Sequence, residues 1–114
     1  MPSLATPTVQ NVADTALLLS RQVVTTTHTI TARTIFRCDA TGGAFAITLP
    51  AASNLDGRIL IIKKIDASVN AVTVTRAGSD TIDGATTFTL TNQYDTVILA
   101  SDQDNDVWDV IATV

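Results

Sequence analysis

The chain of 114 residues has few of the side chains that usually carry out chemistry. It contains one His, one Cys, one Trp and one Tyr, and its aromatic content is 4%. All 11 acidic residues are Asp, and Glu, which mainly serves helices, is missing. Apolar residues make up 46% and charged residues 16%, too apolar and too weakly charged for a disordered chain. The composition predicts a small folded domain and gives little support to an enzyme.

A single cysteine, Cys38, rules out an intrachain disulfide and gives no sign of a disulfide-built secretory scaffold. The first residues lack the basic and apolar regions of a signal peptide, and no apolar run approaches membrane-spanning length. The net charge is −4, whereas a protein that binds phosphate backbones needs clustered Lys and Arg. We therefore expect a soluble protein made in a bacterial-type cytoplasm, with neither nucleic acid nor a membrane as its partner.

The chain is rich in Val, Ile, Leu, Ala and Thr, and much of this content is β-branched. Such side chains pack well on a pleated surface and lose rotamer freedom in helices. Apolar segments separated by turn signals such as Asp56-Gly57 and Asp83-Gly84 predict about eight strands. These cover approximately residues 23–30, 34–39, 45–49, 59–62, 71–76, 86–91, 94–101 and 107–113. Their spacing predicts an all-β fold, specifically an antiparallel jelly-roll-like sandwich.

The segment 59–62, Ile-Leu-Ile-Ile, is continuously apolar rather than alternating. A short run of this kind predicts a strand that is buried on both of its faces. The two lysines that follow, Lys63 and Lys64, are interpreted as the solvated end of that strand.

Residues 1–21 differ from the rest and are predicted to form an N-terminal arm, with the sandwich domain over residues 22–114. Pro2 and Pro7 favour an extended start, and Asn11 or Asp14 can cap a short helix that runs to Leu19. Such a helix is too short to be stable alone in water. The apolar arm residues have no place in the strand pattern and are predicted to bind a partner. They are Leu4, Val9, Val12, Leu17, Leu18 and Leu19.

No set of residues with catalytic spacing emerges, so we predict no catalytic residue, no cofactor and no enzymatic activity. His28 and Cys38 fall in different predicted strands, and nothing in the pattern brings them together. Both are interpreted as structural, and Trp108 and Tyr94 as the main aromatic packing anchors rather than sugar-stacking groups.

The acidic segment Asp102-x-Asp104-x-Asp106 matches the opening of a calcium-binding loop. In such a loop the sixth position is Gly and the twelfth is a bidentate Glu, but here they are Val107 and Thr113. A turn between the last two strands explains the cluster better. We therefore predict no metal site, although the pattern leaves cation binding by these three residues open.

The stretch from about residue 48 to residue 111 resembles a β-sandwich module of phage tail-fibre, neck-fibre and head-decoration proteins. The resemblance rests on the order and spacing of short pieces that are individually weak. They are TLPAAS at 48–53, GRILIIKK at 57–64, NAVTV at 70–74, TIDG at 81–84, QYD at 93–95, VILASD at 97–102 and Trp108. The acidic segment 102–106 departs from the pattern, which often has a short Gly-containing turn there.

The resemblance implies a virion protein that forms a homotrimer and attaches to a capsid or to a host surface. Because the chain holds little besides the module, we expect a capsid decoration (cement) protein that binds the major capsid protein and stabilises the head. The alternative is a receptor-binding or attachment module of a tail or neck fibre, with a host surface glycan as its ligand. A carbohydrate-active enzyme is a third and weaker reading.

Overall fold

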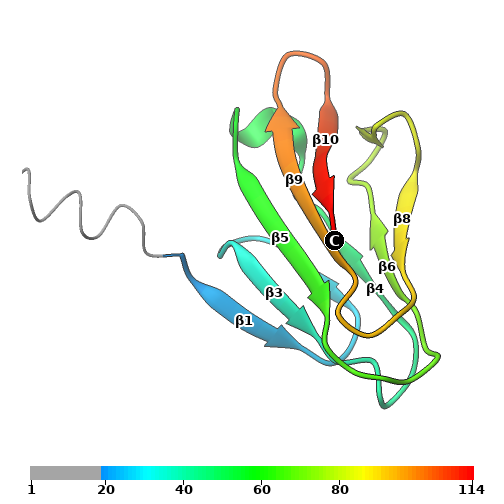
Figure 1. Cartoon of the computed structure of the whole chain (residues 1–114). Helices are drawn as coiled ribbons and strands as arrows, with labels where there is room; N and C mark the ends of the chain where they lie inside the picture. Colours follow the sequence, from blue (N-terminus) through cyan, green and yellow to red (C-terminus); the bar gives the residue numbers. More distant parts are fainter. Residues whose placement is uncertain (1–18) are drawn as a thin grey trace, which may run out of the picture.

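The computed structural model describes residues 19–114, which form two facing β-sheets (Figure 1). The six-stranded sheet A has the order β1-β3-β5-β9-β10-β7, and the four-stranded sheet B has the order β2-β4-β6-β8. The strands are β1 (Arg21–Val24), β2 (His28–Thr29), β3 (Ile35–Cys38), β4 (Phe45–Thr48), β5 (Ile59–Lys64), β6 (Val72–Thr75), β7 (Thr81–Ile82), β8 (Thr87–Leu90), β9 (Thr96–Asp102) and β10 (Val107–Thr113). A short 3-10 turn, η2 (Ala52–Asn54), precedes β5. The all-β prediction is confirmed.

The core lies between the two sheets and is formed by the inward side chains of both. Strands alternate side chains between faces, so every second residue of β3, β4, β5, β6 and β9 is buried. Trp108 is the largest fully buried side chain, and its indole N–H donates to the Pro50 carbonyl oxygen at 2.9 Å. The prediction that Trp108 is a packing anchor is therefore confirmed.

The predicted antiparallel arrangement is wrong for most of the strand pairs. From β1 to β6 the chain crosses between the sheets at every step, so successive strands within one sheet run in the same direction. The pairs β1–β3, β3–β5, β2–β4, β4–β6 and β7–β10 are parallel. Only β5–β9, β9–β10 and β6–β8 are antiparallel. Both sheets are mixed, and the jelly-roll connectivity and the number of about eight strands are not confirmed.

The two ends of the described chain also refine the sequence interpretation. The first predicted strand, residues 23–30, is two strands, β1 and β2, which belong to different sheets. β1 begins at Arg21, and the carbonyl oxygen of Ser20 accepts hydrogen bonds from the backbone N–H groups of Thr34 and Ile35. The proposed helix of the arm lies outside the described residues, apart from Leu19.

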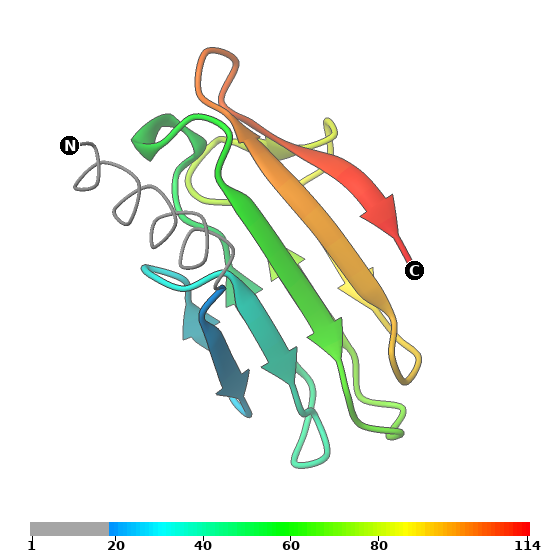
Figure 2. The same ribbon diagram turned by 60° about the vertical axis from the view of Figure 1, so that its left-hand side comes forward.

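Figure 2 shows sheet A nearly face-on, with β1, β3, β5, β9 and β10 side by side in that order. Their registers join into transverse rows, because residue 35 pairs with 61, residue 61 with 98 and residue 98 with 112. Within the described residues, sheet A therefore offers a continuous outer surface five strands wide.

Candidate interaction surface

The outer face of sheet A carries a ladder of isoleucines. Ile35, Ile61 and Ile98 are register partners on three adjacent strands, and each is half-buried. The next row pairs Ile59, which is 42% exposed, with Ala100. A sheet face in water usually presents polar residues opposite the buried ones, so a contiguous aliphatic patch there is a candidate contact surface. We call these five residues the isoleucine face.

Opposite charges lie at the two sides of the isoleucine face. On one side, Arg21 on β1 stands at the end of the Ile35 row, and Arg37 on β3 pairs with Lys63 on β5 two residues further along the strands. Asp102 on β9 and Asp109 on β10 occupy outward positions on the other side. We call these residues the cationic flank and the acidic flank.

The outer face of sheet B has a different composition. Thr29, Thr48, Thr75 and Thr87 form one row across all four strands, and a second row joins Ala46, Thr73 and Thr89. Threonine combines a strand-forming branched side chain with a hydroxyl that water can solvate. We call these two rows the threonine face; its composition is that expected of a sheet surface in contact with water.

A buried ion pair lies between the sheets, at the end of β5. Lys64 is fully buried, and its amine donates to Asp66 Oδ2 at 2.6 Å. The other carboxylate oxygen of Asp66 accepts from the Ala40 backbone N–H at 2.8 Å, and the Ser68 hydroxyl donates to Oδ2. The interpretation of Lys64 as a solvated strand end is wrong, because Asp66 and Ser68 supply buried partners that a strand pattern cannot reveal.

The pKa of Asp66 reflects two opposing effects. Burial alone raises the pKa of the carboxyl group, but the hydrogen bonds from Lys64, Ser68 and the Ala40 backbone lower it further than burial raises it. The net result is a pKa well below the usual range, so the carboxylate stays charged beside Lys64. The pair ties the β3–β4 connection to the β5–β6 connection, which is a structural role.

The two candidate catalytic side chains do not form a nucleophile–base pair. Cys38 is buried in the core, and burial together with the charge of Asp66 raises the pKa of its thiol to about 12. Its Sγ lies 4.0 Å from the Phe36 carbonyl oxygen, and His28 packs against the Phe36 ring with centroids 6.1 Å apart. A thiol with so high a pKa is a poor nucleophile at neutral pH.

The acidic segment forms the turn between β9 and β10. Asp102 accepts hydrogen bonds from the Asn105 backbone N–H at 3.3 Å and from its side-chain amide at 2.9 Å. Asp106 has a φ of 54°, a left-handed conformation that Asp adopts more readily than most residues. Asp104 is exposed. The turn thus uses the carboxylate of Asp102 and the backbone conformation of Asp106, and the absence of a metal requirement stays a prediction.

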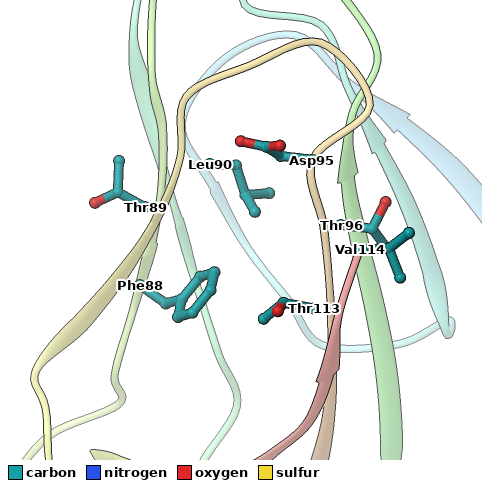
Figure 3. Close-up of a pocket in the computed structure, with 7 residues that line it drawn as sticks. All are labelled: Phe88, Thr89, Leu90, Asp95, Thr96, Thr113 and Val114. Atoms are coloured by element: carbon teal, nitrogen blue, oxygen red, sulfur yellow. The ribbon is translucent and has the colours of Figure 1, made fainter.

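A cleft of about 400 Å³ opens between β8 and the ends of β9 and β10 (Figure 3). Phe88, Leu90 and Thr113 contribute to its walls, and Asp95 is its charged residue. The Asp95 carboxylate already accepts the backbone N–H groups of Thr91 and Asn92, at 3.2 and 2.9 Å. The cleft therefore does not assemble two acid–base groups of the kind that hydrolysis requires.

The remaining predicted site residues have mixed outcomes. Tyr94 is not a core anchor, because its side chain is 58% exposed and the Lys63 amine lies 5.2 Å from the centre of its ring. Leu4, Val9, Val12, Leu17 and Leu18 lie outside the described residues. Leu19 is exposed, just before β1. The prediction that the strand at 59–62 is buried on both faces is wrong for the described residues, because Ile59 is exposed and Ile61 is half-buried on the outer face. Sequence reasoning also missed Ile35 and Ile98 as surface residues.

Comparison with protein-family models and with curated proteins found no match to this chain. Within residues 19–114 no three His, Cys, Asp or Glu side chains gather in a way that could hold a metal ion. The same residues contain no helix with the length and apolar character needed to cross a membrane.

Proposed function

We propose that this chain is a structural protein of a tailed-phage virion, a homotrimeric capsid decoration protein that binds the assembled head. The observation that carries the proposal is the isoleucine face, a rigid aliphatic surface on a β-module whose sequence resembles virion modules. Exposed apolar area costs roughly 25 cal/mol per Å², so a surface of this kind favours association over a free monomer. A protein that binds only the assembled shell stabilises it by mass action.

In this proposal the arm makes the contact with the major capsid protein. Leu17, Leu18 and Leu19 immediately precede the edge strand β1, so the arm departs from the side of sheet A. Burial of one leucine side chain contributes roughly 1.5–3 kcal/mol. Ordering the arm costs about 1–2 kcal/mol per residue, so several of its apolar residues must be buried together for attachment to be stable.

Deletion of residues 1–18 tests this division of roles. The shortened chain keeps β1 and the Ser20 carbonyl that caps it, so we expect a folded β-protein by circular dichroism and loss of binding to particles that lack the protein. The full-length double variant Leu17→Ser/Leu18→Ser should weaken binding in the same direction, while Thr89→Ser on the threonine face should not. Decoration by the shortened chain at the level of the full chain would show that the arm is not the anchor.

One observation favours the alternative, a receptor-binding module of a tail or neck fibre. Tyr94 is exposed on a turn and adopts a φ of 71°, so the fold holds an aromatic ring in solvent at one end of the sandwich. Exposed tyrosines are common at recognition surfaces because they are apolar with a polar tip. Binding to a glycan array that is lost in Tyr94→Ala, without decoration of heads, would support this alternative over the leading proposal.

A further inference from the structure

We infer that the isoleucine face is the contact between copies of this chain, with the cationic flank of one copy against the acidic flank of the next. The inference rests on the proposed homotrimer and specifies the surface that forms it.

The first argument is the contrast between the two outer faces. Both belong to the same small domain, and both follow the alternation that strands impose. On sheet B the two outward rows are threonine except for Ala46, whereas the central outward positions of sheet A hold Ile35, Ile61 and Ile98. Neighbouring strands lie about 4.8 Å apart, so the three side chains form one continuous apolar strip. Composition alone cannot explain why only one face is aliphatic.

The second argument identifies the occupant. The cationic residues lie on β1, β3 and β5, while Asp102 and Asp109 lie on β9 and β10, across the apolar strip. A surface that carries both signs on opposite sides is complementary to another copy of itself. No second kind of partner is needed to match its charges, and such complementarity favours the correct register.

The arrangement also favours a ring. When one side of a surface contacts the opposite side of the same surface on the next copy, the contact is head-to-tail, and it gives a closed ring where the rotation between neighbouring copies is a whole fraction of a turn. In a ring of three, the isoleucine faces turn toward the three-fold axis and the threonine faces turn outward. In this arrangement the aliphatic isoleucine face is covered by the neighbouring copies, and the hydroxyl-bearing threonine face is exposed to water.

The first test replaces the apolar strip without removing strand-forming residues. In the full-length double variant Ile61→Thr/Ile98→Thr, threonine keeps the β-branched shape, so the sandwich should fold. We expect the association constant from sedimentation equilibrium to fall by at least about 100-fold, the size of effect that central interface residues have. The matched control, Thr73→Val/Thr75→Val on β6, should leave the trimer unchanged. Circular dichroism and thermal unfolding check the fold of each variant.

The second test uses the charges and does not depend on the isoleucines. Arg37→Asp and Asp109→Arg should each weaken association, because each places like charges at the contact. The double variant Arg37→Asp/Asp109→Arg restores opposite signs and the original net charge, so we expect it to recover most of the association. A rise in ionic strength should weaken the wild-type ring, since flank charges are screened by salt.

The outcomes separate this inference from the proposed function. A trimer that persists in Ile61→Thr/Ile98→Thr, or charge variants without any effect, overturns the inference. A wild-type protein that is monomeric also overturns the inference. This includes a monomer in which residues 1–18 of the same chain cover the isoleucine face; in that case the isoleucine variant would have a lowered melting temperature without any change in association. Decoration of heads by such a monomer would leave the decoration role standing and refute the homotrimer. A trimer that is lost with the isoleucines but binds no particle would support the inference and refute decoration.

Discussion

The strands β5 and β6 follow one another in the chain, yet they differ in their outward side chains and at the inner end of β5. β6 buries Val72 and Val74 completely and turns Thr73 and Thr75 outward. β5 turns Ile59 and Ile61 outward, and its inward positions end with the fully buried Lys64. β6 follows the ordinary rule for a half-solvated sheet, and β5 departs from it on both faces.

The difference shows that two separate requirements act on β5. Inside, the end of the sandwich is closed by loops whose backbone groups need partners, and Lys64 with Asp66 and Ser68 supplies them. Outside, the isoleucines have no such explanation within the described residues, because they leave apolar area in water. The side chains of β5 are therefore explained by the groups that pack against them rather than by exposure to water.

The largest expected effect on folding comes from Lys64. Lys64→Met keeps the length of the side chain but leaves the Asp66 carboxylate without its charged partner. Removal of one member of a buried pair typically costs about 3–5 kcal/mol, so we expect a loss of that order in the free energy of unfolding from urea titration. The control is Lys63→Met, whose contact within the described chain is the one with the Tyr94 ring, worth about 0.5–1 kcal/mol. Because Lys63 also belongs to the cationic flank, both variants are compared at a protein concentration at which the wild type is monomeric.

The double variant Lys64→Met/Asp66→Asn sharpens the comparison further. It removes both charges, and it should recover part of the loss because no unpaired charge remains buried. Equal effects of Lys64→Met and Lys63→Met would show that Lys64 is solvated after all, as the sequence suggested.

The sequence predicted the strands better than their partners. Alternation and turn signals located β3, β4, β5, β6, β8, β9 and β10, each within a few residues. They did not separate β1 from β2, because the threonines at 25–27 continue the alternation through the crossing between sheets. The two-residue β7 is too short to give a pattern. Parallel pairing was missed because the alternation of side chains does not depend on the connection that follows a strand. It is the same whether the chain turns back to pair in the same sheet or crosses to the other sheet.

The candidate surface shows the same limit. The continuous run at 59–62 predicted a strand buried on both faces, but in the described chain its outer face is partly exposed at Ile59 and Ile61. The match of Ile35 and Ile98 to that run depends on register across three strands that are distant in sequence. Likewise, Lys64 and Asp66 are two residues apart, but their burial depends on Ala40 in another connection. Register and burial are tertiary properties, so they could not be predicted from a single sequence.

A smaller effect is expected from acid. The pKa of Asp66 is lowered in the folded protein, so its contribution to stability is complete above the unfolded value, about 3.9, and is lost as the pH falls below it. We expect the melting temperature of the wild type to fall between about pH 4 and pH 2, and Asp66→Asn to show a shallower slope over that interval. Asp104→Asn is the control, because Asp104 is exposed on the β9–β10 turn. Identical slopes in the wild type and Asp66→Asn would contradict the prediction.

The smallest expected effect is that of calcium on the acidic end of sheet A. Asp102 is used by the β9–β10 turn, and Val107 and Thr113 stand where a calcium loop has Gly and Glu, so too few oxygens converge for a tight site. Thermal unfolding in millimolar calcium and then in excess chelator should give the same midpoint, and sedimentation should give the same association constant. This second readout matters because a bound cation would reduce the negative charge beside the acidic flank and weaken its attraction to Arg37 and Lys63. A midpoint shift of several degrees that disappears in Asp104→Asn, a variant that spares the hydrogen bonds of the turn, would refute the prediction. It would also mean that the charge of the acidic flank, and so its attraction to the cationic flank, depends on a bound metal ion.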